Sequence, residues 1–499
     1  MIKDNRILLG KAEEKEIYLE PSRLTQHGLI CGASGTGKTV TLKVIAESLS
    51  ELGIPTVIAD VKGDLSGMVK PGDLASIQGR LDKMGITGYT VNGYPVHFFD
   101  VNRKLGMPVR TVLEDMDPGL LGALLELTDV QQGVLQIIFQ AADDMDLDLI
   151  DFADLEAMAG YVHQHSKEIS AKYGNVSGQS IGTLQRKMLQ LKAEHGDLLF
   201  GMPALDLNDL FEVKDGMGVM NILECRELYA HPMQYACVLL WLLNEIYVSQ
   251  KEAGAVEKPK LVFFFDEAHL LFEEANPAMK EIITRIMRLI RSKGIGVFFI
   301  TQSPADIPDE ILGQLQNRIE HSLRAYTPAE IKAVKQAAQS FRANPAFKTE
   351  DRIANMATGT ALVSTLDEEG TPGMVEETKI LPPHSSMKAV SDEEIVKETQ
   401  SDSLYDRYAK DEDPESAMED ITRLNEEAEK EAEKKKEKEK QDKLQEAEEK
   451  EKIRQEAKRR ADQKNTYSRL ARKVQRRAET ELVNAGVRSA RKFLKNLLG

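Results

Sequence analysis

The apolar positions at the start of the chain alternate between short continuous runs and runs with helical spacing. Ile17–Leu24 and Gly28–Cys31 have the pattern of strands, and Lys38–Leu52 carries apolar residues at the spacing of a helix. Ile54–Ala59 is again a continuous apolar strand, and Asp60 ends it. A strand, loop, helix and strand in this order, with fully apolar strands, predict a parallel sheet that is covered on both faces.

From about residue 109 to residue 211 the strand pattern stops. Apolar residues recur there at helical spacing, and Gly, Asp and Pro separate the successive segments. We therefore predict an α-helical insertion over about residues 109–211. Its predicted helices include Leu120–Leu127, Gln131–Ala141, Ile150–Tyr161 and Ser180–Lys192.

Strands resume after the insertion, with long helices between them, and this order predicts an α/β doubly wound core. The last two strands flank the turn-rich sequence EEGTPG, which favours a hairpin. The predicted elements are the strands Gly218–Leu223, Leu261–Phe265, Gly296–Ile300 and Arg318–Ala325, the helices Met233–Gln250 and Ala278–Ser292, and the hairpin strands Thr360–Leu366 and Met374–Leu381.

Beyond Pro383 the composition changes to that of a charged extension. Residues 426–464 consist almost entirely of Glu, Lys, Ala and Gln, and their charges nearly cancel. Glu–Lys pairs four residues apart favour an exposed helix. Leu444 and Ile453 stand almost alone among these charges and do not form a sustained coiled-coil seam. A long solvated helix and a disordered spacer both fit this pattern.

The 499 residues carry a formal net charge of −16, but the charge is unevenly distributed. Nine Lys and Arg residues in 466–499 face only Glu479 and Glu481, so this tail carries +7 and leaves −23 on residues 1–465. The acidic body argues against non-specific coating of DNA, whereas a local basic arm or a ring lumen is still able to contact phosphates. Val487–Leu498 also has an amphipathic pattern, which fits a partner protein, an anionic membrane or a solvated helix.

The cysteines and the apolar runs exclude several classes of protein. Cys31, Cys225 and Cys237 form no CxxC pair, so neither a disulfide framework nor a structural zinc site is expected. The N-terminus has no apolar core of a signal peptide. The runs Tyr235–Val248 and Leu261–Phe272 fall short of the ~20 apolar residues of a membrane span. We expect a soluble, reduced, cytoplasmic protein with no integral membrane association.

A complete phosphate-binding motif follows the strand Gly28–Cys31 and precedes the helix that begins at Lys38. Its glycines allow backbone N–H groups to turn toward phosphate oxygens, and the helix N-terminus favours negative charge. Lys38 is expected to reach the β- and γ-phosphates, and the Thr39 hydroxyl to bind Mg²⁺. The sequence therefore predicts an ATP and Mg²⁺ site on the residues Gly32, Ala33, Ser34, Gly35, Thr36, Gly37, Lys38 and Thr39.

Polar residues end three further predicted strands. Asp266 and Glu267 follow Leu261–Phe265, where Asp266 is expected to hold Mg²⁺ through water and Glu267 to act as the general base on the attacking water. Gln302 follows the next strand and suits a sensor of the γ-phosphate or its water. Asp60 falls at the carboxyl edge where ligands bind in such sheets. Each residue also has a simpler interpretation. Asp266 and Glu267 would only solvate the end of a strand, Gln302 would cap a strand, and Asp60 would cap a loop.

Arginines could supply the positive charge that phosphoryl transfer needs. Arg285, Arg288 and Arg291 recur every three residues on one predicted helix, and Arg318 and Arg324 flank the strand that follows. An arginine that reaches the γ-phosphate of a neighbouring subunit would stabilise the charge of the transition state. A solvated helix face or a surface ion pair is the simpler interpretation of any one of them.

Five motifs together resemble the HerA-like branch of the FtsK/HerA P-loop ATPases, and most of all a bacterial HerA-like helicase-domain family with a charged C-terminal extension. These motifs are GASGTGKT, IADVKGD, FFFDEAH, RSKGIGVFFITQSP and NRIEHSLRAYTP, and the resemblance covers about residues 5–385. It implies a RecA-like fold of the ASCE type with a mainly parallel sheet, usually assembled as a hexameric ring. Family members couple ATP hydrolysis to translocation on double-stranded DNA, and archaeal members work with a nuclease.

The resemblance also assigns roles to individual residues. It implies that Lys38 and Thr39 bind phosphate and magnesium, that Asp266 is the second magnesium partner, and that Glu267 is the catalytic base. Gln302 would be the sensor and Asp60 an accessory acid. Arg291 is the first choice for the arginine finger, and Arg324 is the second. The phosphate loop begins only 31 residues into the chain, too early for the full N-terminal β-barrel of the archaeal relatives.

The expected organisation is a short N-terminal β segment over 1–27, an ATPase core over 28–385 with the helical insertion, and a charged helical or partly disordered extension over 386–499 that is basic from residue 466. Three functions fit this organisation. The first is a ring-forming ATPase acting on DNA as a translocase or helicase. The second is a nucleotide-dependent switch or assembly ATPase that acts on a partner protein. The third is a phosphotransferase, which Glu267 and Gln302 disfavour because they suit water as the acceptor.

Overall fold

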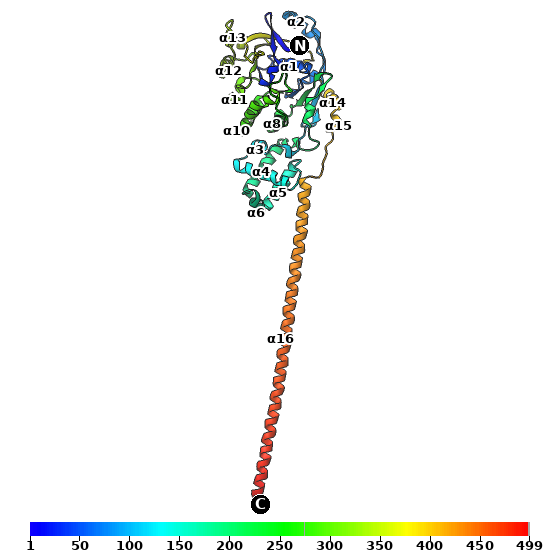
Figure 1. The fold of residues 1–499 in the computed structure, drawn as a ribbon, viewed down its shortest axis with the longest axis vertical. Helices are drawn as coiled ribbons and strands as arrows, with labels where there is room; N and C mark the ends of the chain where they lie inside the picture. Colours follow the sequence, from blue (N-terminus) through cyan, green and yellow to red (C-terminus); the bar gives the residue numbers. More distant parts are fainter. Residues whose placement is uncertain (274, 498–499) are drawn as a thin grey trace. The chain divides into compact units, whose positions relative to one another are not determined.

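The computed structural model describes residues 1–273 and 275–497. The chain divides into two compact units, Met1–Ile421 and Thr422–Gly499. Leu498 and Gly499, the end of the predicted tail, lie outside the described residues. The first unit is built on one large mixed sheet flanked by helices (Figure 1).

Eight strands form the parallel part of this sheet, in the order β13-β4-β12-β11-β5-β10-β6-β7. Their pairing is parallel throughout. The predicted strands are confirmed to within four residues at each end, whereas β6 and β7 were not predicted. The bounds are β4 (Gly28–Cys31), β5 (Thr56–Asp60), β6 (Val96–Asp100), β7 (Met107–Pro108), β10 (Met220–Glu224), β11 (Leu261–Phe265), β12 (Ile295–Thr301) and β13 (Asn317–His321).

Five strands extend the sheet beyond β13 with antiparallel pairing. The predicted hairpin is confirmed, because β14 and β15 pair directly. The second half of the predicted strand Ile17–Leu24 is wrong: Pro21–Gln26 forms a 3₁₀ turn, since proline has no N–H for a strand ladder. The bounds are β1 (Ile2–Lys3), β2 (Arg6–Ala12), β3 (Lys15–Leu19), β14 (Thr360–Ser364) and β15 (Glu376–Ile380), and a separate ribbon joins β8 (Val213–Lys214) to β9 (Met217–Gly218).

The sheet is covered on both faces, as predicted. Alternate residues of a strand belong to different hydrophobic clusters, so Phe263 and Phe265 pack on one face and Phe264 on the other. Helices α8 and α10 contribute to the first cluster and α1 to the second. The helices of the core are α1 (Lys38–Glu51), α2 (Leu74–Met84), α8 (Pro232–Ser249), α9 (His269–Glu273), α10 (Pro277–Leu289), α11 (Asp309–Leu312), α12 (Pro328–Gln339) and α13 (Thr349–Asn355).

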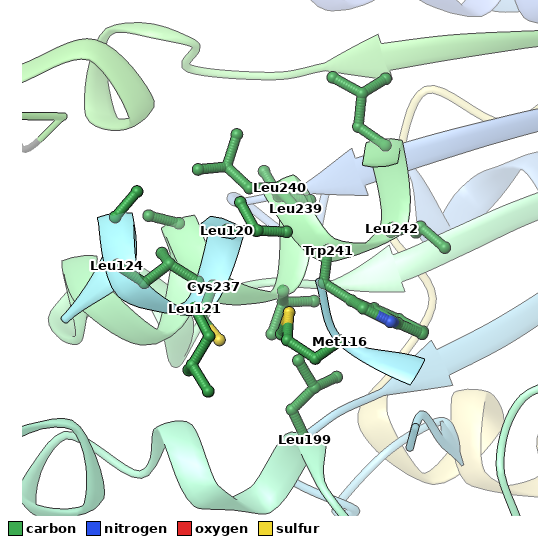
Figure 2. Close-up of a cluster of buried hydrophobic side chains, with 14 of the residues drawn as sticks. Met116, Leu120, Leu121, Leu124, Leu199, Cys237, Leu239, Leu240, Trp241 and Leu242 are labelled. Atoms are coloured by element: carbon green, nitrogen blue, oxygen red, sulfur yellow. The ribbon is translucent and has the colours of Figure 1, made fainter. Parts of the chain in front are cut away.

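The segment between β7 and β8 is helical. Its helices pack on the core through apolar side chains, and Figure 2 shows Leu120 of α3 beside Leu240 of α8, and Leu121 of α3 beside Cys237 of α8. These side chains are almost completely buried, so this junction belongs to the main hydrophobic core. The helices are α3 (Pro118–Leu124), α4 (Asp129–Asp144), α5 (Phe152–Gln164), α6 (Ser166–Tyr173) and α7 (Gly178–Ala193).

Residues 386–421, which the sequence groups with the extension, belong to the first unit. They contain α14 (Asp392–Gln400) and α15 (Tyr405–Tyr408). The buried Arg110 guanidinium donates to Tyr408 O at 3.2 Å and pairs with Asp411. Such a buried cation is tolerated because carbonyl and carboxylate oxygens surround it.

Helix α16 (Ala417–Leu497) contains the charged residues of the extension, so the structure has a helix where the sequence also allowed a disordered spacer. Pairs of Glu and Lys four residues apart support it, as in Glu426–Lys430 at 3.3 Å and Glu446–Lys450 at 3.4 Å. Among the described residues, no helix combines the length and the apolar character that crossing a membrane would require.

Candidate nucleotide-binding site

The phosphate loop joins the end of β4 to the start of α1. Gly32, Gly35 and Gly37 have φ values of 148°, 77° and 123°, which glycine adopts without a steric cost. Lys38 is 5% exposed, and its Nζ donates to Gly32 O at 2.6 Å and to Ala33 O at 3.4 Å. Burial lowers the pKa of Lys38, and Glu267 opposes this effect. The loop thus places an amine beside the backbone that a phosphate would contact.

His321, at the end of β13, packs against the phosphate loop at Gly32 and Gly37. It was not identified from the sequence. Its Nδ1 donates to Thr360 O at 3.1 Å, and its Nε2 accepts from the Thr41 hydroxyl at 2.8 Å. Burial lowers the pKa of His321 to about 4, so the ring stays neutral at pH 7. A side chain on Gly32 would collide with His321, because a Cβ there would lie 2.5 Å from the His321 Cβ.

The predicted polar residues converge because their strands are neighbours. The strand order β4-β12-β11-β5 places the phosphate loop, Gln302, Asp266 and Asp60 at the carboxyl ends of four adjacent parallel strands. The carboxyl ends of these strands meet at one edge, since Cys31 pairs with Thr301 and Phe265 with both Phe299 and Ala59. The sheet therefore brings residues far apart in sequence to one site.

The two acidic residues after β11 have opposite electrostatic environments. Burial raises the pKa of Asp266 to about 6, and the neighbouring Glu267 adds to this effect. Burial would also raise the pKa of Glu267, but His269 and Lys62 outweigh it and lower the pKa to about 2. His269 Nδ1 lies 3.1 Å from Glu267 Oε2, and Lys62 Nζ donates to Glu267 Oε1. Glu267 is therefore an ionised carboxylate at neutral pH.

The loop after β5 supplies two residues that the sequence did not identify. The Asp60 carboxylate accepts from the backbone N–H groups of Lys62, Gly63 and Leu65 at 3.2, 2.7 and 3.0 Å, so it caps this loop. The loop presents Lys62 to Glu267 and Asp64 to the phosphate loop. Asp60 thus holds the loop in shape, which matches the simpler interpretation of this residue as a loop-capping Asp.

The residues around Thr39 suit a magnesium ion. The Thr39 hydroxyl donates to Asp64 Oδ2 at 3.2 Å, while Asp64 Oδ1 is buried and has no hydrogen-bond partner among the described residues. Magnesium favours hydroxyl, carboxylate, water and phosphate oxygens and needs few protein ligands. No cluster of three or more His, Cys, Asp or Glu residues in the described parts of the chain could hold a metal alone. Thr39, Asp64 and Asp266 are donors that fit an ion shared with a nucleotide.

The affinity for Mg²⁺–nucleotide is expected to fall as the pH drops below about 6, because a protonated Asp266 no longer attracts the cation. The loss should approach about tenfold per pH unit, as one proton competes with the ion. Isothermal titration calorimetry between pH 5 and 8 measures it. Asp60, whose pKa burial raises to about 7, titrates nearby, so the Asp266→Asn variant isolates Asp266. An identical pH dependence in that variant contradicts the assignment.

Gln302 and Arg324 lie on one side of the phosphate loop. Both line a cavity of about 350 Å³ together with Ala33 and Ser34. Asp306 fixes the start of this segment, since its Oδ2 accepts from the Thr301 hydroxyl at 2.6 Å and from Ser303 N at 2.9 Å. Gln302 and Arg324 are exposed, so both side chains are accessible from solvent.

Arg291 lies elsewhere. It belongs to the 3₁₀ turn Ile290–Lys293, which directly precedes β12. The phosphate loop and Asp266 follow the carboxyl ends of their strands, so Arg291 lies at the opposite edge of the parallel sheet. Of the two arginines proposed as a finger, the structure brings only Arg324 near the phosphate loop of the same chain.

Replacing Lys62 with Ala is expected to raise the pKa of Glu267 from about 2 toward its ordinary value of 4.5, because the variant loses one of the cations that favour the carboxylate. If hydrolysis requires ionised Glu267, the acidic limb of the kcat profile should move to higher pH. The measurement is kcat at saturating Mg²⁺–ATP across acidic and neutral pH. Lys62→Arg retains the charge and should keep the limb in place. An unmoved limb in Lys62→Ala would separate Lys62 from the base.

Three features define a P-loop ATPase of the HerA/FtsK type. They are the parallel sheet, the phosphate loop after β4, and the carboxylates after β11, which β12 separates from β4 in the sheet. The family model of the helicase HerA-like C-terminal family matches residues 5–499, and the chain belongs to this family. This confirms the family expected from the five motifs.

The relatives found by sequence are archaeal proteins. The DNA double-strand break repair helicase HerA of Saccharolobus solfataricus is 22% identical over 368 residues, which cover 72% of this chain and 66% of that protein. The corresponding helicase of Sulfolobus acidocaldarius is 22% identical over 365 residues, covering 71% and 65%. A probable helicase of Methanocaldococcus jannaschii is 19% identical over 335 residues, covering 66% and 58%. The alignments thus span somewhat less than two thirds of the relatives' own lengths.

Solved structures with a similar chain path include two bacterial proteins. The conjugative coupling protein TrwB has a TM-score of 0.49 and 14% identity, covering 78% of this chain and 92% of that chain. VirB4 of Thermoanaerobacter pseudethanolicus has a TM-score of 0.48 and 15% identity, covering 77% and 99%. One structure of TrwB contains ADP and Mg²⁺.

Proposed function

We propose that the protein is an Mg²⁺-dependent ATPase that works as a ring-shaped motor on double-stranded DNA, as a translocase or helicase. The observation that carries the hydrolytic part is the ionised Glu267 carboxylate, held next to Asp266 and beside a phosphate loop with a buried lysine. A protein that only binds nucleotide needs the loop and the magnesium ligands. A hydrolase also needs a base positioned for water.

The chain's own residues divide the work of phosphoryl transfer. The N–H groups of the phosphate loop and the Lys38 amine bind the phosphates, because N–H donors and a cation at a helix N-terminus attract anions. Thr39 and Asp266, with Asp64, hold the magnesium ion, which neutralises developing charge on the phosphates when bound. Glu267 accepts the proton of the attacking water, and Gln302 orients that water or the γ-phosphate.

Lys62 has a positioning role in this proposal. It holds one oxygen of Glu267, and nearly half of its side chain remains accessible to solvent. A phosphate entering beside Lys38 would compete with Glu267 for the Lys62 amine, since both are anions. Without a phosphate, the contact between Lys62 and Glu267 keeps the Glu267 carboxylate ionised and in place.

An arginine would complete the charge stabilisation. Arg324 is our candidate to act on the nucleotide of its own chain, and the cavity that it lines together with Ala33 and Ser34 supports this role. Arg291 is exposed at the far edge of the sheet, where it would act only on a neighbouring subunit, as in a hexameric ring. The two arginines therefore have separable expected roles, one within a chain and one between chains.

DNA as the track is supported by the family and by the names of the archaeal relatives, which are repair helicases. The body of the chain is acidic, so contact with DNA requires local basic surfaces. The exposed run Arg469–Arg477 of α16 is one such surface. A nuclease or another protein partner remains part of the proposal for the complete assembly.

The deciding experiment is the rate of ATP hydrolysis with and without duplex DNA, combined with a mass measurement of the oligomer. Stimulation by duplex DNA in a hexamer, with an affinity that falls steeply with salt, supports the motor. Hydrolysis that ignores DNA and responds instead to a partner protein would replace it with a nucleotide-dependent assembly ATPase. A complete lack of hydrolysis would overturn the enzymatic part.

A further inference from the structure

The last part of α16, residues 482–497, has one apolar face. Val483, Val487, Ala490, Leu494 and Leu497 follow one another at spacings of four and three residues, which places them on one side of a helix. We call this set the C-terminal seam. The seam is open to solvent. The side chains of Val483 and Val487 are 64% and 50% exposed, and those of Leu494 and Leu497 are 60% and 69% exposed.

The rest of the same segment is mostly polar, and all of its charged residues are cations. Between Leu482 and Leu497 there is no acidic residue, and the acids that come before it are Glu479 and Glu481. At 100° per residue the cations fall beside and behind the seam. This differs from residues 426–464 of the same helix, where Glu and Lys nearly cancel. The cations are Arg488, Arg491, Lys492 and Lys495.

We propose that residues 482–497 form an amphipathic helix that binds the surface of an anionic lipid bilayer. The C-terminal seam would enter the boundary between headgroups and acyl chains, and the four cations would remain among the anionic headgroups. A helix with Leu and Val on one side, and Lys and Arg as the only charged residues elsewhere, has the composition of such interfacial helices. The proposal is independent of the proposed ATPase function and adds a site at which the chain attaches to a surface.

Charge and geometry favour lipid over the other two occupants. A duplex DNA would satisfy the four cations but would leave the C-terminal seam in water, because phosphates offer no apolar surface. A second copy would cover the seam, but it spans barely two heptads, and Arg491 beside it would meet only positive charge. An anionic bilayer supplies both an apolar layer and negative charge.

The test uses the full chain and sedimentation with vesicles. The protein is expected to bind vesicles of mixed phosphatidylglycerol and phosphatidylcholine, and to bind pure phosphatidylcholine far more weakly. Each Lys or Arg near an anionic surface contributes about fivefold in affinity. Replacing Arg488, Arg491, Lys492 and Lys495 with Gln should therefore weaken binding by at least about 100-fold. The double variant Leu494→Gln, Leu497→Gln should weaken binding to both kinds of vesicle.

The matched control is the double variant Leu444→Gln, Ile453→Gln, which alters two equally exposed apolar residues in the charge-balanced part of α16. It should bind vesicles like the natural chain. Equal binding by all variants, or equal binding to charged and neutral vesicles, overturns the proposal. So does a result in which the four Gln substitutions abolish binding to duplex DNA while neither the natural chain nor any variant binds vesicles. A lower oligomer mass in the Leu494→Gln, Leu497→Gln variant without any vesicle binding would instead assign the seam to self-association.

Discussion

Glu267→Gln is expected to bind Mg²⁺–ATP like the natural chain and to hydrolyse it about 10²–10⁴ times more slowly. The amide keeps the size of the side chain but cannot accept a proton from water. Binding should survive because Lys38, Thr39 and Asp266 are unchanged. The variant also loses the ion pair with Lys62, but the Lys62 side chain is 42% exposed, so water can solvate its amine.

Single-turnover hydrolysis and the affinity for a fluorescent nucleotide analogue measure the two effects separately. Glu273→Gln is the matched control, because Glu273 is an exposed carboxylate that ends the same short helix, α9. It should leave both quantities unchanged. A Glu267→Gln protein with the natural turnover rate would remove Glu267 as the base. A protein that loses nucleotide binding would show that Glu267 acts on the ground state instead.

The parts of the fold that follow from local pattern were predictable. The strand Leu261–Phe265 is fully apolar because helices cover both faces of it, and the structure gives it the same bounds. Strand β6, Val96–Asp100, escaped prediction because His97 and Asp100 interrupt the apolar run. His97 lies between Asp402 and Glu212, which are distant in sequence, at 2.6 and 3.0 Å. Asp100 accepts from the backbone N–H groups of the turn that follows the strand. Such tertiary pairing leaves no periodic signal in the sequence.

The site was predictable where a residue follows a strand directly. The phosphate loop, Asp266 and Gln302 follow β4, β11 and β12, and the sheet order makes these strands neighbours. Lys62 and Asp64 also stand at a strand end, within IADVKGD, but nothing in the sequence says that the Asp60 carboxylate folds this loop back toward Glu267. His321 lies at the end of β13, and its contact with the phosphate loop depends on the pairing of β13 with β4.

Lys38→Ala is expected to lose most nucleotide binding and, with it, hydrolysis at ordinary ATP concentrations. A charge-assisted hydrogen bond contributes about 1.5–3 kcal/mol, which corresponds to a loss of affinity of about 10- to 150-fold. The fold should tolerate the change. Burial lowers the pKa of Lys38, so the charged amine costs stability in the protein without nucleotide, and its removal relieves that cost. A thermal melt in the absence of nucleotide should therefore show an unfolding midpoint no lower than that of the natural chain.

Two further variants separate charge from shape. Lys38→Arg keeps the positive charge but changes the geometry, because a planar guanidinium replaces a compact ammonium that now fits beside Gly32 O. It should bind nucleotide better than Lys38→Ala and still hydrolyse slowly. Lys83→Ala removes an exposed lysine of α2 and should change nothing. Natural turnover in Lys38→Ala would refute the site, whereas a large drop in its melting temperature would attribute the lost binding to the fold rather than to the missing phosphate contact.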